Sequence, residues 1–319
     1  MTDFKAIASS LEERGFCVIP EFLSREEIDF LVEEFDACPD SEPAPRTKHG
    51  AKHLGDQAVD RRTASPAVRG QTAALRTTAV GRKETFQGIR PRMEAFAQGL
   101  TGAKAALYQI LYLQTPVISL PFHQDHDHFF LTEYNRTHLN YWIPLVKPSR
   151  TETGLRLIPW DRLGEKSPRL FNLCRRSGAS RFYSLRDGGT LYFSDWSGVT
   201  WHKEDLEIEE EDLEIEEVME TPEVGVGDLL LLRVNTIHST QTTDDRRLAV
   251  SLRTCDPETP IDWHRVAGSP TPRMMQYLGG MKGNPAPNKL FFAAFQHVQE
   301  NDFGITLGDL VPTLTGERE

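Results

Sequence analysis

The sequence predicts one mainly antiparallel β domain with flanking helices, and three observations support this prediction. First, six short runs between residues 105 and 256 are rich in apolar, β-branched and aromatic residues, with turn residues between them. Second, no helical pattern alternates with these runs, which argues against a doubly wound parallel sheet and favours an antiparallel sandwich or barrel. Third, 319 residues, of which 39% are hydrophobic, can bury a sizeable core. We therefore expect a single domain over residues 1–319.

The N-terminal segment, residues 1–40, predicts a helix, a short strand and a second helix. The first helix has the apolar stripe Phe4, Ile7 and Leu11, and the second has Ile28, Leu31, Val32 and Phe35. Between them, the apolar run 16–19 before Pro20 favours an edge strand, because proline stops strand pairing. Ser24 and Glu27 form a capping box that starts the second helix.

The remaining chain divides by composition into three further segments. Residues 41–106 are basic and rich in glycine, proline and threonine, with a helix expected only at 89–100. The core of strands is expected over 105–256, in the runs 106–120, 138–146, 154–159, 188–196, 227–234 and 247–254. Residues 257–319 form a C-terminal extension with a helix expected at 288–300.

The net charge of −11 comes from one acidic insertion. Residues 204–223 hold twelve acids and no base, and without them 35 acids stand against 36 bases. The unit EDLEIEE occurs twice in this insertion, over 204–217. Its leucine and isoleucine form no apolar face on a helix, and as a strand the two copies face opposite ways. We therefore expect an exposed flap or a disordered insertion.

Composition also disfavours several classes of protein. No apolar run approaches the roughly 20 residues of a membrane-spanning helix, and the first residues lack the pattern of a signal peptide. The cysteines lack metal-ligand spacing: Cys17, Cys38, Cys174 and Cys255. We therefore expect neither a zinc site nor a disulfide framework, and a cytoplasmic location. Few aromatic residues accompany the bases of 41–106, which disfavours a nucleic-acid partner.

The motif FHQDHDHFF carries the sharpest functional signal. Alternate residues of an extended chain point the same way, so His123 and Asp125 project together from the end of a strand. These two ligands and a distant histidine can occupy one face of an octahedral metal and leave three positions open, which suits Fe(II) and oxidation chemistry. An isolated HxD motif is common by chance, and Asp127, which shares the parity of Asp125, is an alternative ligand.

A second motif supplies the distant histidine. The run VGVGDLLLLRVNTIHST predicts a turn at Gly227 and Asp228, a buried strand and then His238. Arg247 follows nine residues later, at the start of another strand. Its planar guanidinium can hold a carboxylate through two parallel hydrogen bonds, which a lysine cannot do.

Three arginines compete for this role. On the predicted strand, Arg247, Ala249, Ser251 and Arg253 share one face, and Leu248, Val250 and Leu252 share the other. Arg246 lies on the apolar face and is expected to turn to solvent. Arg253 lies deeper along the strand, so we favour Arg247.

The ordered set of motifs resembles the phytanoyl-CoA dioxygenase family. Its signature is followed in order by HQD, WIPL, GLRLIP, GD, His238 and Arg247. The opening segment of the family is similar to GFCVIPEFLSREEIDFLVEEF. The likeness covers residues 10–40 and 105–255. The resemblance implies a double-stranded β-helix (a jelly-roll, cupin-like fold) that uses Fe(II), 2-oxoglutarate and O₂. It also implies iron ligation by His123, Asp125 and His238, with Arg247 on the far carboxylate of 2-oxoglutarate.

Two stretches depart from the family pattern. Glu152 and Thr153 replace the usual Asn-Gly, with Gly154 one place later, and Trp-Asp-Arg at 160–162 replaces a small Gly-Ser-His. We expect both changes near the cofactor or substrate mouth. Related halogenases carry a small residue at the carboxylate position, so the intact Asp125 favours hydroxylation or another oxidation over halogenation.

Four further residues are candidate contacts to cofactor or substrate. Gln109 lies on the strand before HQD, where relatives place a polar residue into the pocket. Asn140 and Trp142 alternate on one face of the next strand, and Ser251 shares the face of Arg247. Strand-surface or core roles remain the alternatives for these residues. The other histidines fit ordinary loop or structural roles, with contact to metal or substrate as the alternative for the first two: His126, His128 and His202.

These observations predict a non-haem Fe(II)- and 2-oxoglutarate-dependent dioxygenase. We expect it to hydroxylate a small polar or anionic metabolite, such as a specialised metabolite or an amino-acid derivative. Desaturation, cyclisation or epimerisation at the same iron site is an alternative, and a non-catalytic jelly-roll protein that retains a metal is an alternative of another class. The expected partners are the small-molecule substrate and O₂, with no nucleic acid and no membrane. The basic region resembles a substrate lid in position, and deletion of 204–217 is expected to spare iron binding.

Overall fold

The computed structural model describes a defined part of the chain. The described residues are 2–37, 88–115, 122–124, 136–168, 170–172, 182–185, 190–194, 213–241, 245–261, 304–306 and 309. For some of these only the backbone is described: 108–112, 114–115, 123, 182–185, 190–194 and 213–216. Most of the basic region, the first acidic repeat and the helix expected at 288–300 lie outside the described residues. Among the described helices, none has the length and apolar character needed to cross a membrane.

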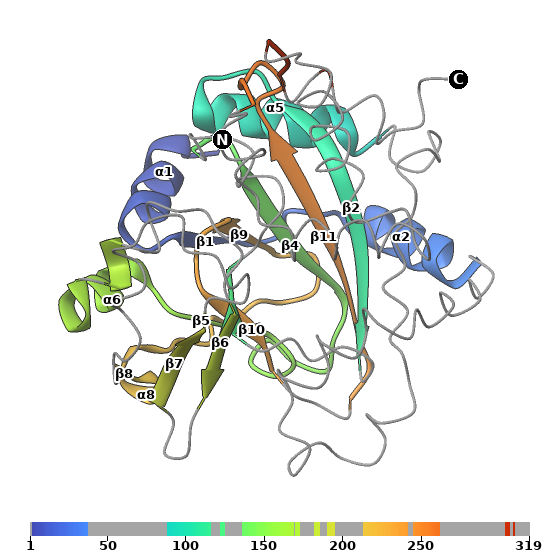
Figure 1. Ribbon diagram of the computed structural model, residues 1–319. Coiled ribbons are helices and arrows are strands. Elements are labelled where there is room, and N and C mark those ends of the chain that lie inside the picture. The colour runs from blue at the N-terminus through green and yellow to red at the C-terminus, as the bar shows by residue number, and fades with distance from the viewer. Residues whose placement is uncertain are drawn as a thin grey trace, which may run out of the picture.

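Two antiparallel sheets form the described body of the molecule (Figure 1). The larger sheet has the order β1-β9-β4-β11-β2, with bounds Phe16–Ile19, Leu229–Arg233, Leu139–Val146, Arg247–Cys255 and Ala106–Thr115. The smaller sheet has the order β5-β10-β3-β6-β7-β8, with bounds Leu155–Leu157, His238–Thr240, Phe122–His123, Phe182–Leu185, Thr190–Ser194 and Leu213–Glu214. Most neighbouring strands are distant in sequence, and the predicted jelly-roll fold is confirmed.

The six apolar runs predicted as strands each contain one, namely β2, β4, β5, β7, β9 and β11. The expected edge strand at 16–19 is β1, which lies at one end of the larger sheet. The strand β6 and the short helix α6 (Trp160–Lys166) were not predicted. Alternation and apolar runs therefore identified the long strands, whereas the short elements depend on tertiary contacts.

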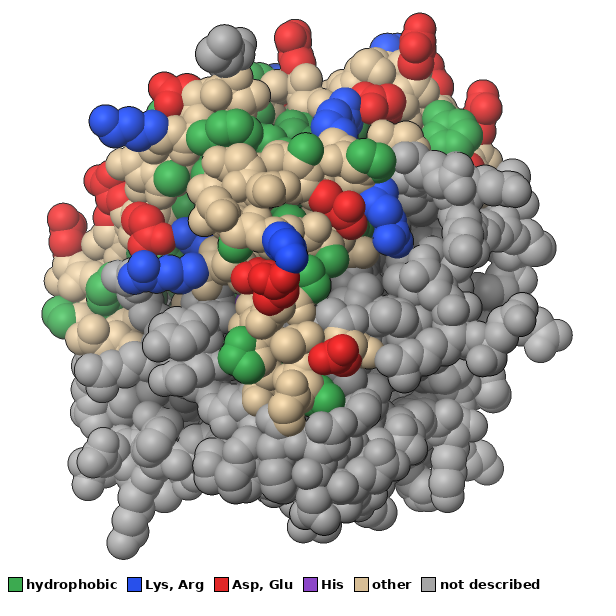
Figure 2. All heavy atoms as spheres, turned by 90° about the horizontal axis from the view of Figure 1, so that it is seen from above, with side chains coloured by type: hydrophobic (Ala, Val, Ile, Leu, Met, Phe, Trp, Pro, Cys, Tyr) green, Lys and Arg blue, Asp and Glu red, His purple; other side chains and the backbone are tan. Residues whose placement is uncertain are grey.

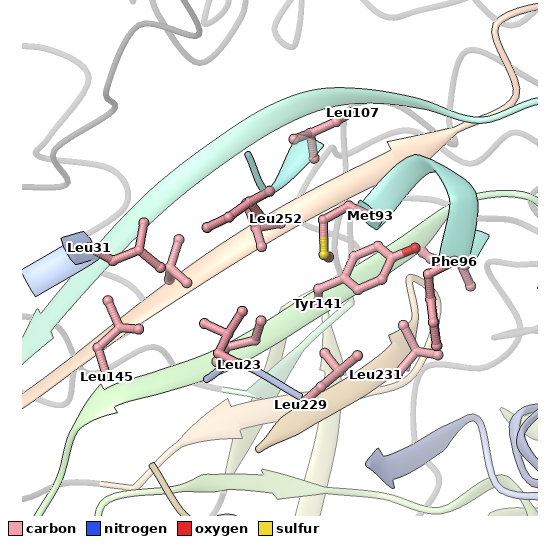
Figure 3. Packing of buried hydrophobic residues seen from close by; sticks show 14 of the residues in the cluster. Leu23, Leu31, Met93, Phe96, Leu107, Tyr141, Leu145, Leu229, Leu231 and Leu252 are labelled. Atoms are coloured by element: carbon pink, nitrogen blue, oxygen red, sulfur yellow. The ribbon is translucent and has the colours of Figure 1, made fainter. Parts of the chain in front are cut away.

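Three helices cover one face of the larger sheet, which we call the outer face (Figures 1 and 3). They are α1 (Phe4–Glu13), α2 (Arg25–Ala37) and α5 (Arg90–Thr101). Met93 and Phe96 of α5 lie against Tyr141 of β4, and the rings of Phe96 and Tyr141 meet edge to face with centroids 6.1 Å apart. Burial of this apolar surface is the main favourable contribution to folding of the sheet and helices.

Local sequence explains where these helices begin and end. The Ser24 N–H donates to Glu27 Oε2 at 2.8 Å, and the Glu27 N–H donates to Ser24 Oγ at 3.3 Å, so the predicted capping box is confirmed. Gly102 ends α5 in the left-handed region (φ +74°), and its N–H donates to Gln98 O at 2.8 Å. The helix predicted at 89–100 is therefore confirmed within one residue at each end.

The turn predicted before β9 connects this strand to the N-terminal segment. Gly227 has φ +82°, and a Cβ atom there would lie 2.8 Å from Ile28, so glycine is required. Asp228, almost fully buried, accepts hydrogen bonds from the N–H groups of Glu21 at 2.9 Å and Gly225 at 2.7 Å. Its Oδ2 also pairs with Arg150 Nη2 at 2.7 Å. The GD motif thus has a structural role in this chain.

The inner face of the larger sheet packs against the smaller sheet. Trp142, Leu230, Leu232 and Ala249 form one buried cluster with Leu155 and Leu157 of β5. Their neighbours Leu248, Val250 and Leu252 belong instead to the cluster beneath the helices. The predicted parity of β11 is therefore confirmed, and the residues that share the face of Ala249 point between the two sheets.

The end of the second acidic repeat, residues 213–217, forms a strand of the smaller sheet and a short helix, so the alternative of a disordered insertion is wrong for this part, while the exposed flap stays a prediction. Its Leu213 pairs with Leu191 in β7, and the chain then changes from β8 to the short helix α8 (Ile215–Val218). Val218 is completely buried in a small apolar cluster. Deletion of 204–217 would therefore remove a sheet strand.

On the face shown in Figure 2, the described acidic and basic side chains are intermixed. Near α2 and α5, Arg25 pairs with Asp29 at 2.8 Å and Arg92 pairs with Glu27 at 2.9 Å. Exposed ion pairs of this kind contribute little to stability, typically below about 1 kcal/mol. The described charges of the face in Figure 2 therefore form no large patch of one sign.

Candidate functional site

The structure places the two predicted metal-binding histidines on neighbouring strands. His238 of β10 lies directly opposite His123 of β3, and opposite Leu157 of β5 on its other side. Residues that face each other in an antiparallel ladder have Cα atoms about 4.5–5.5 Å apart. Two side chains at that spacing can reach a common metal ion when they point to the same side of the sheet. The His123 side chain and Asp125 lie outside the described part of the structure.

The imidazole of His238 is oriented by its own backbone turn. The side chain is buried, and Nδ1 lies 2.9 Å from the carbonyl oxygen of Thr236. A carbonyl oxygen only accepts, so Nδ1 carries the proton, and in the neutral ring the lone pair is then on Nε2. Thr236 is itself held, because its Oγ1 donates to Gly15 O at 2.8 Å. This arrangement is the one in which histidine binds a metal through Nε2.

The residues that follow Gln124 in the HQD region belong to the part of the chain that the structure does not describe. Asp125, His126, Asp127, His128 and the more distant His202 lie outside the described residues. Within the described residues, no three His, Cys, Asp or Glu side chains gather as a metal centre. Metal ligation by His123, Asp125 and His238 therefore stays a prediction.

Arg247 lies on the inner face at the start of β11 and is completely buried. Its Nη1 donates to the carbonyl oxygen of Thr153 at 2.8 Å and contacts that of Gly154 at 3.4 Å. The guanidinium carbon lies 5.8 Å from the centre of the Trp142 ring. Burial lowers the pKa of Arg247 to about 10, so the group is still a cation at neutral pH. A buried cation of fixed orientation favours an anionic ligand.

The turn that holds Arg247 is the first stretch that departs from the family pattern. Thr153 is buried with φ +57°, a conformation that strains a β-branched residue. The next residue, Gly154, donates its N–H to Gln241 Oε1, and its carbonyl accepts from the Gln241 N–H at 3.0 Å. The strained turn thus presents two successive carbonyl groups to the guanidinium, and its expected position near the cofactor or substrate mouth stays a prediction.

The second departing stretch has a different environment. Trp160 is buried and lies against Gly15, while Asp161 and Arg162 contact charged groups: Arg14 at 4.0 Å and Glu220 at 3.1 Å respectively. These contacts connect α6 to the end of α1 and to the segment after α8. The described contacts of this stretch are therefore structural, and its expected position near the cofactor or substrate mouth stays a prediction.

Asn140, Trp142 and Ser251 come together on the inner face. Ser251 lies opposite Trp142 in the ladder, and its Oγ donates to Asn140 Oδ1 at 2.9 Å. All three are almost fully buried, and among the described residues no group accepts a hydrogen bond from Trp142 Nε1. The backbone of Gln109 pairs with Arg253, whereas the Gln109 side chain lies outside the described part. Trp142 thus lies beside Arg247, while Ser251 and Asn140 lie farther along the same face.

The three competing arginines have distinct surroundings. Arg246 is exposed and lies 3.4 Å from Asp36 of α2, as expected for a residue that turns to solvent. Arg253 is partly exposed and stands near the fully buried His138. Burial, and then the charge of Arg253, lower the pKa of His138 to about 3, so this histidine is neutral. Of the three arginines, Arg247 is the completely buried one, held by backbone carbonyls.

The sequence analysis did not identify Lys147, which directly follows β4. Its Nζ donates to Val224 O at 2.8 Å and to Arg150 O at 3.1 Å. Burial, then the charges of Arg247 and Arg150, lower the pKa of Lys147 to about 8. A lysine after a strand carries no recognisable motif, so its proximity to Arg247 becomes visible only in the fold.

A model of the phytanoyl-CoA dioxygenase family matches residues 11–249 of this chain. No curated protein matches the sequence. Among solved structures, the 2-oxoglutarate-dependent epimerase SnoN from nogalamycin biosynthesis is 17% identical (TM-score 0.48), over 81% of this chain and 85% of its own. EctD from S. alaskensis with 2-oxoglutarate and 5-hydroxyectoine is 14% identical (TM-score 0.48), over 82% and 78%. HygX from Streptomyces hygroscopicus with iron bound is 12% identical (TM-score 0.46), over 80% and 86%. None of these three likenesses bears on the reaction of this chain.

Proposed function

Because this chain belongs to the phytanoyl-CoA dioxygenase family of Fe(II)- and 2-oxoglutarate-dependent oxygenases, we propose that His123, Asp125 and His238 bind its iron. The register of His238 opposite His123 is the observation that supports this assignment most strongly. The contact of His238 Nδ1 with Thr236 O adds to it, since that contact directs Nε2 toward a ligand. Two imidazoles and one carboxylate suit Fe(II) and leave coordination positions open.

Arg247 is the proposed contact for the far carboxylate of 2-oxoglutarate. The guanidinium is buried on the inner face and is held in one orientation by Thr153 O and Gly154 O. A fixed, planar pair of donors in a dry site fits a carboxylate with two parallel hydrogen bonds. Trp142 lies beside Arg247, and Ser251 and Asn140 continue along the same face; these three are proposed to contact the cofactor, together with Gln109 of β2.

The chemistry that bound Fe(II), 2-oxoglutarate and O₂ supply is oxidation of a substrate, with conversion of 2-oxoglutarate to succinate and CO₂. The protein contributes position and exclusion of water. Arg247 orients one end of the co-substrate, and the Thr236 carbonyl fixes the ring and the protonation of His238. The apolar inner-face cluster keeps this part of the site dry, which strengthens the charge interaction of Arg247.

For the reaction, we favour hydroxylation of a small polar or anionic metabolite. The polar and basic groups of the inner face, Asn140, Ser251 and Arg253, support a polar substrate. Desaturation, cyclisation and epimerisation require the same protein groups and are the alternatives. A non-catalytic protein that retains a metal is disfavoured, because a purely structural metal does not require a buried arginine such as Arg247.

The test is to load the full-length protein with Fe(II) and 2-oxoglutarate without oxygen, and then to add O₂ with a panel of small polar and anionic metabolites. We expect a visible charge-transfer band and succinate release that depends on one substrate class. His123→Ala and His238→Ala are expected to lose both. Succinate release in proportion to product in these variants would contradict the metal assignment. A protein that binds iron without a 2-oxoglutarate band would favour the binding-protein alternative.

A further inference from the structure

The residue between the two proposed ligands in HQD, Gln124, has an unusual contact. Its side chain is 1% exposed, and its Nε2 donates to the carbonyl oxygen of Asn235 at 2.6 Å. Asn235 is also buried and lies in the turn that connects β9 to β10, directly before His238. A side chain from one ligand-bearing segment is thus bound to the backbone of the other.

We infer that Gln124 is a positioning residue that sets the distance between the two halves of the metal site, an inference that rests on the proposed function. In an extended chain Gln124 points away from the side shared by His123 and Asp125, so it acts through the backbone and not as a ligand. Its amide binds the turn that places His238.

The turn before His238 uses two successive carbonyl groups for this purpose. The Asn235 carbonyl accepts from Gln124 at 2.6 Å, and the Thr236 carbonyl orients the His238 ring at 2.9 Å. The turn is anchored from outside, because Thr236 Oγ1 donates to Gly15 O at 2.8 Å and the Thr236 N–H donates to Arg233 O at 3.0 Å. One rigid turn therefore sets both the ring of one histidine and the position of the strand that carries the other.

The described pairing between β3 and β10 is short, although β3 also pairs with β6 on its other side. This strand has two residues, and its described pairing with β10 consists of the single pair His123 and His238. A ladder of one pair constrains register and strand distance weakly. The buried Gln124 amide adds a directional contact on the next residue, and outer hydrogen bonds of this kind commonly change metal affinity by about 10–100-fold.

The alternative interpretation is that this hydrogen bond stabilises the sheet and has no effect on the metal. The two interpretations differ in what they predict for metal affinity in a folded variant. Gln124→Met keeps the approximate volume and removes the N–H donor. Gln124→Asn keeps an amide on a side chain that is one methylene shorter and so cannot span the same gap. Both variants test the same contact with different effects on packing.

The experiment measures Co(II) binding to the full-length, metal-stripped protein by visible absorption, with circular dichroism and thermal unfolding alongside. We expect Gln124→Met and Gln124→Asn to fold, to raise the Kd for Co(II) by about 10–100-fold and to alter the shape of the Co(II) spectrum. At saturating Co(II), their affinity for 2-oxoglutarate is expected to match that of the wild type, because the turn that holds Arg247 is unchanged.

Gln241→Met is the matched control. Gln241 also binds a backbone turn, but its Oε1 accepts from Gly154, next to Arg247. This variant is expected to leave the Co(II) affinity within about twofold of wild type and to weaken 2-oxoglutarate binding. Equal loss of Co(II) affinity in Gln241→Met and in the Gln124 variants would assign the effect to general packing and overturn the inference.

Two further outcomes would also overturn it. A folded Gln124→Met with a Co(II) Kd within about twofold of wild type would show that the contact does not position the ligands. Failure of both Gln124 variants to fold would assign the hydrogen bond to stability alone. A wild-type protein that binds neither Co(II) nor Fe(II) would instead contradict the proposed function, so the two failures are distinguishable.

Discussion

The two faces of the larger sheet are built from the same strands but from different kinds of side chain. The outer face of β4, β9 and β11 is apolar and lies beneath α1, α2 and α5. The inner face combines apolar residues with Arg247, Asn140 and Ser251, all buried between the sheets. A buried polar side chain is costly unless it is bound. The outer face therefore contributes mainly to stability, whereas the inner face carries buried polar groups that lower stability and can bind ligands.

The largest expected effect is on the outer face. Leu231→Ala removes a completely buried side chain beneath the helices and leaves a cavity, so the free energy of unfolding should fall by about 2–5 kcal/mol. The affinity for 2-oxoglutarate should be unchanged. Denaturant unfolding and an anaerobic 2-oxoglutarate titration measure the two quantities. Phe30→Ala, at an exposed position on α2, is the control and should change stability by less than about 0.5 kcal/mol.

The next effect is on the inner face, where ligand affinity should change and stability should not fall. Arg247→Gln should raise the Kd for 2-oxoglutarate by about 100-fold, because a bidentate contact between two charges is lost. Stability should change little or increase, since a buried cation is removed. Arg246→Gln removes the exposed neighbour and should leave the affinity unchanged. An equal loss in Arg246→Gln would contradict the assignment of the clamp.

A smaller effect is expected when one buried hydroxyl group is removed from each face. Ser251→Ala removes the hydrogen bond to Asn140, and Tyr141→Phe removes the one between Tyr141 Oη and Thr254 Oγ1 at 3.0 Å. Each should lower the free energy of unfolding by about 1 kcal/mol. The inner-face variant should also weaken 2-oxoglutarate binding, whereas Tyr141→Phe should not. If both variants bind 2-oxoglutarate as the wild type does, Ser251 is structural.

The smallest effect is a pH dependence next to Arg247. The pKa of Lys147 is about 8 in the folded protein and about 10.5 when unfolded, so the unfolded chain binds more protons between these values. The titration of Lys147 should therefore raise the free energy of unfolding of the wild type between pH 8 and pH 10.5. Lys147→Met has no such titration. The free energy of unfolding of this variant, relative to the wild type, should therefore fall by roughly 1 kcal/mol over that window, a small value because Lys147 is partly exposed. A constant difference across the window would contradict this origin.

Much of the fold follows from the sequence, and the reasons are physical. The alternation of Leu248, Val250 and Leu252 with Arg247 and Ser251 predicts which residues face the helices and which face the second sheet, because the side-chain period of a strand is two. Ser24 and Glu27 predict a helix start for an equally local reason.

The site itself is less accessible to such reasoning. The opposition of His238 and His123 depends on the pairing of two strands of the smaller sheet that are distant in sequence, which no local pattern specifies. The strained Thr153, the contact of Gln124 with Asn235 and the position of Lys147 near Arg247 likewise arise from long-range packing. The regular structure at the end of the acidic repeat was not predicted for a related reason, because its strand β8 forms by pairing with β7.

The pairing of β3 with β10 has a consequence for synthesis of the protein. The chain between His123 and His238 must be complete before these two strands can meet, and closing so long a loop has a substantial entropic cost. A nascent polypeptide that has not yet extended through β10 contains the HQD motif but lacks His238. We therefore expect metal acquisition to be a late event, after most of the chain has left the ribosome and the sheets have closed.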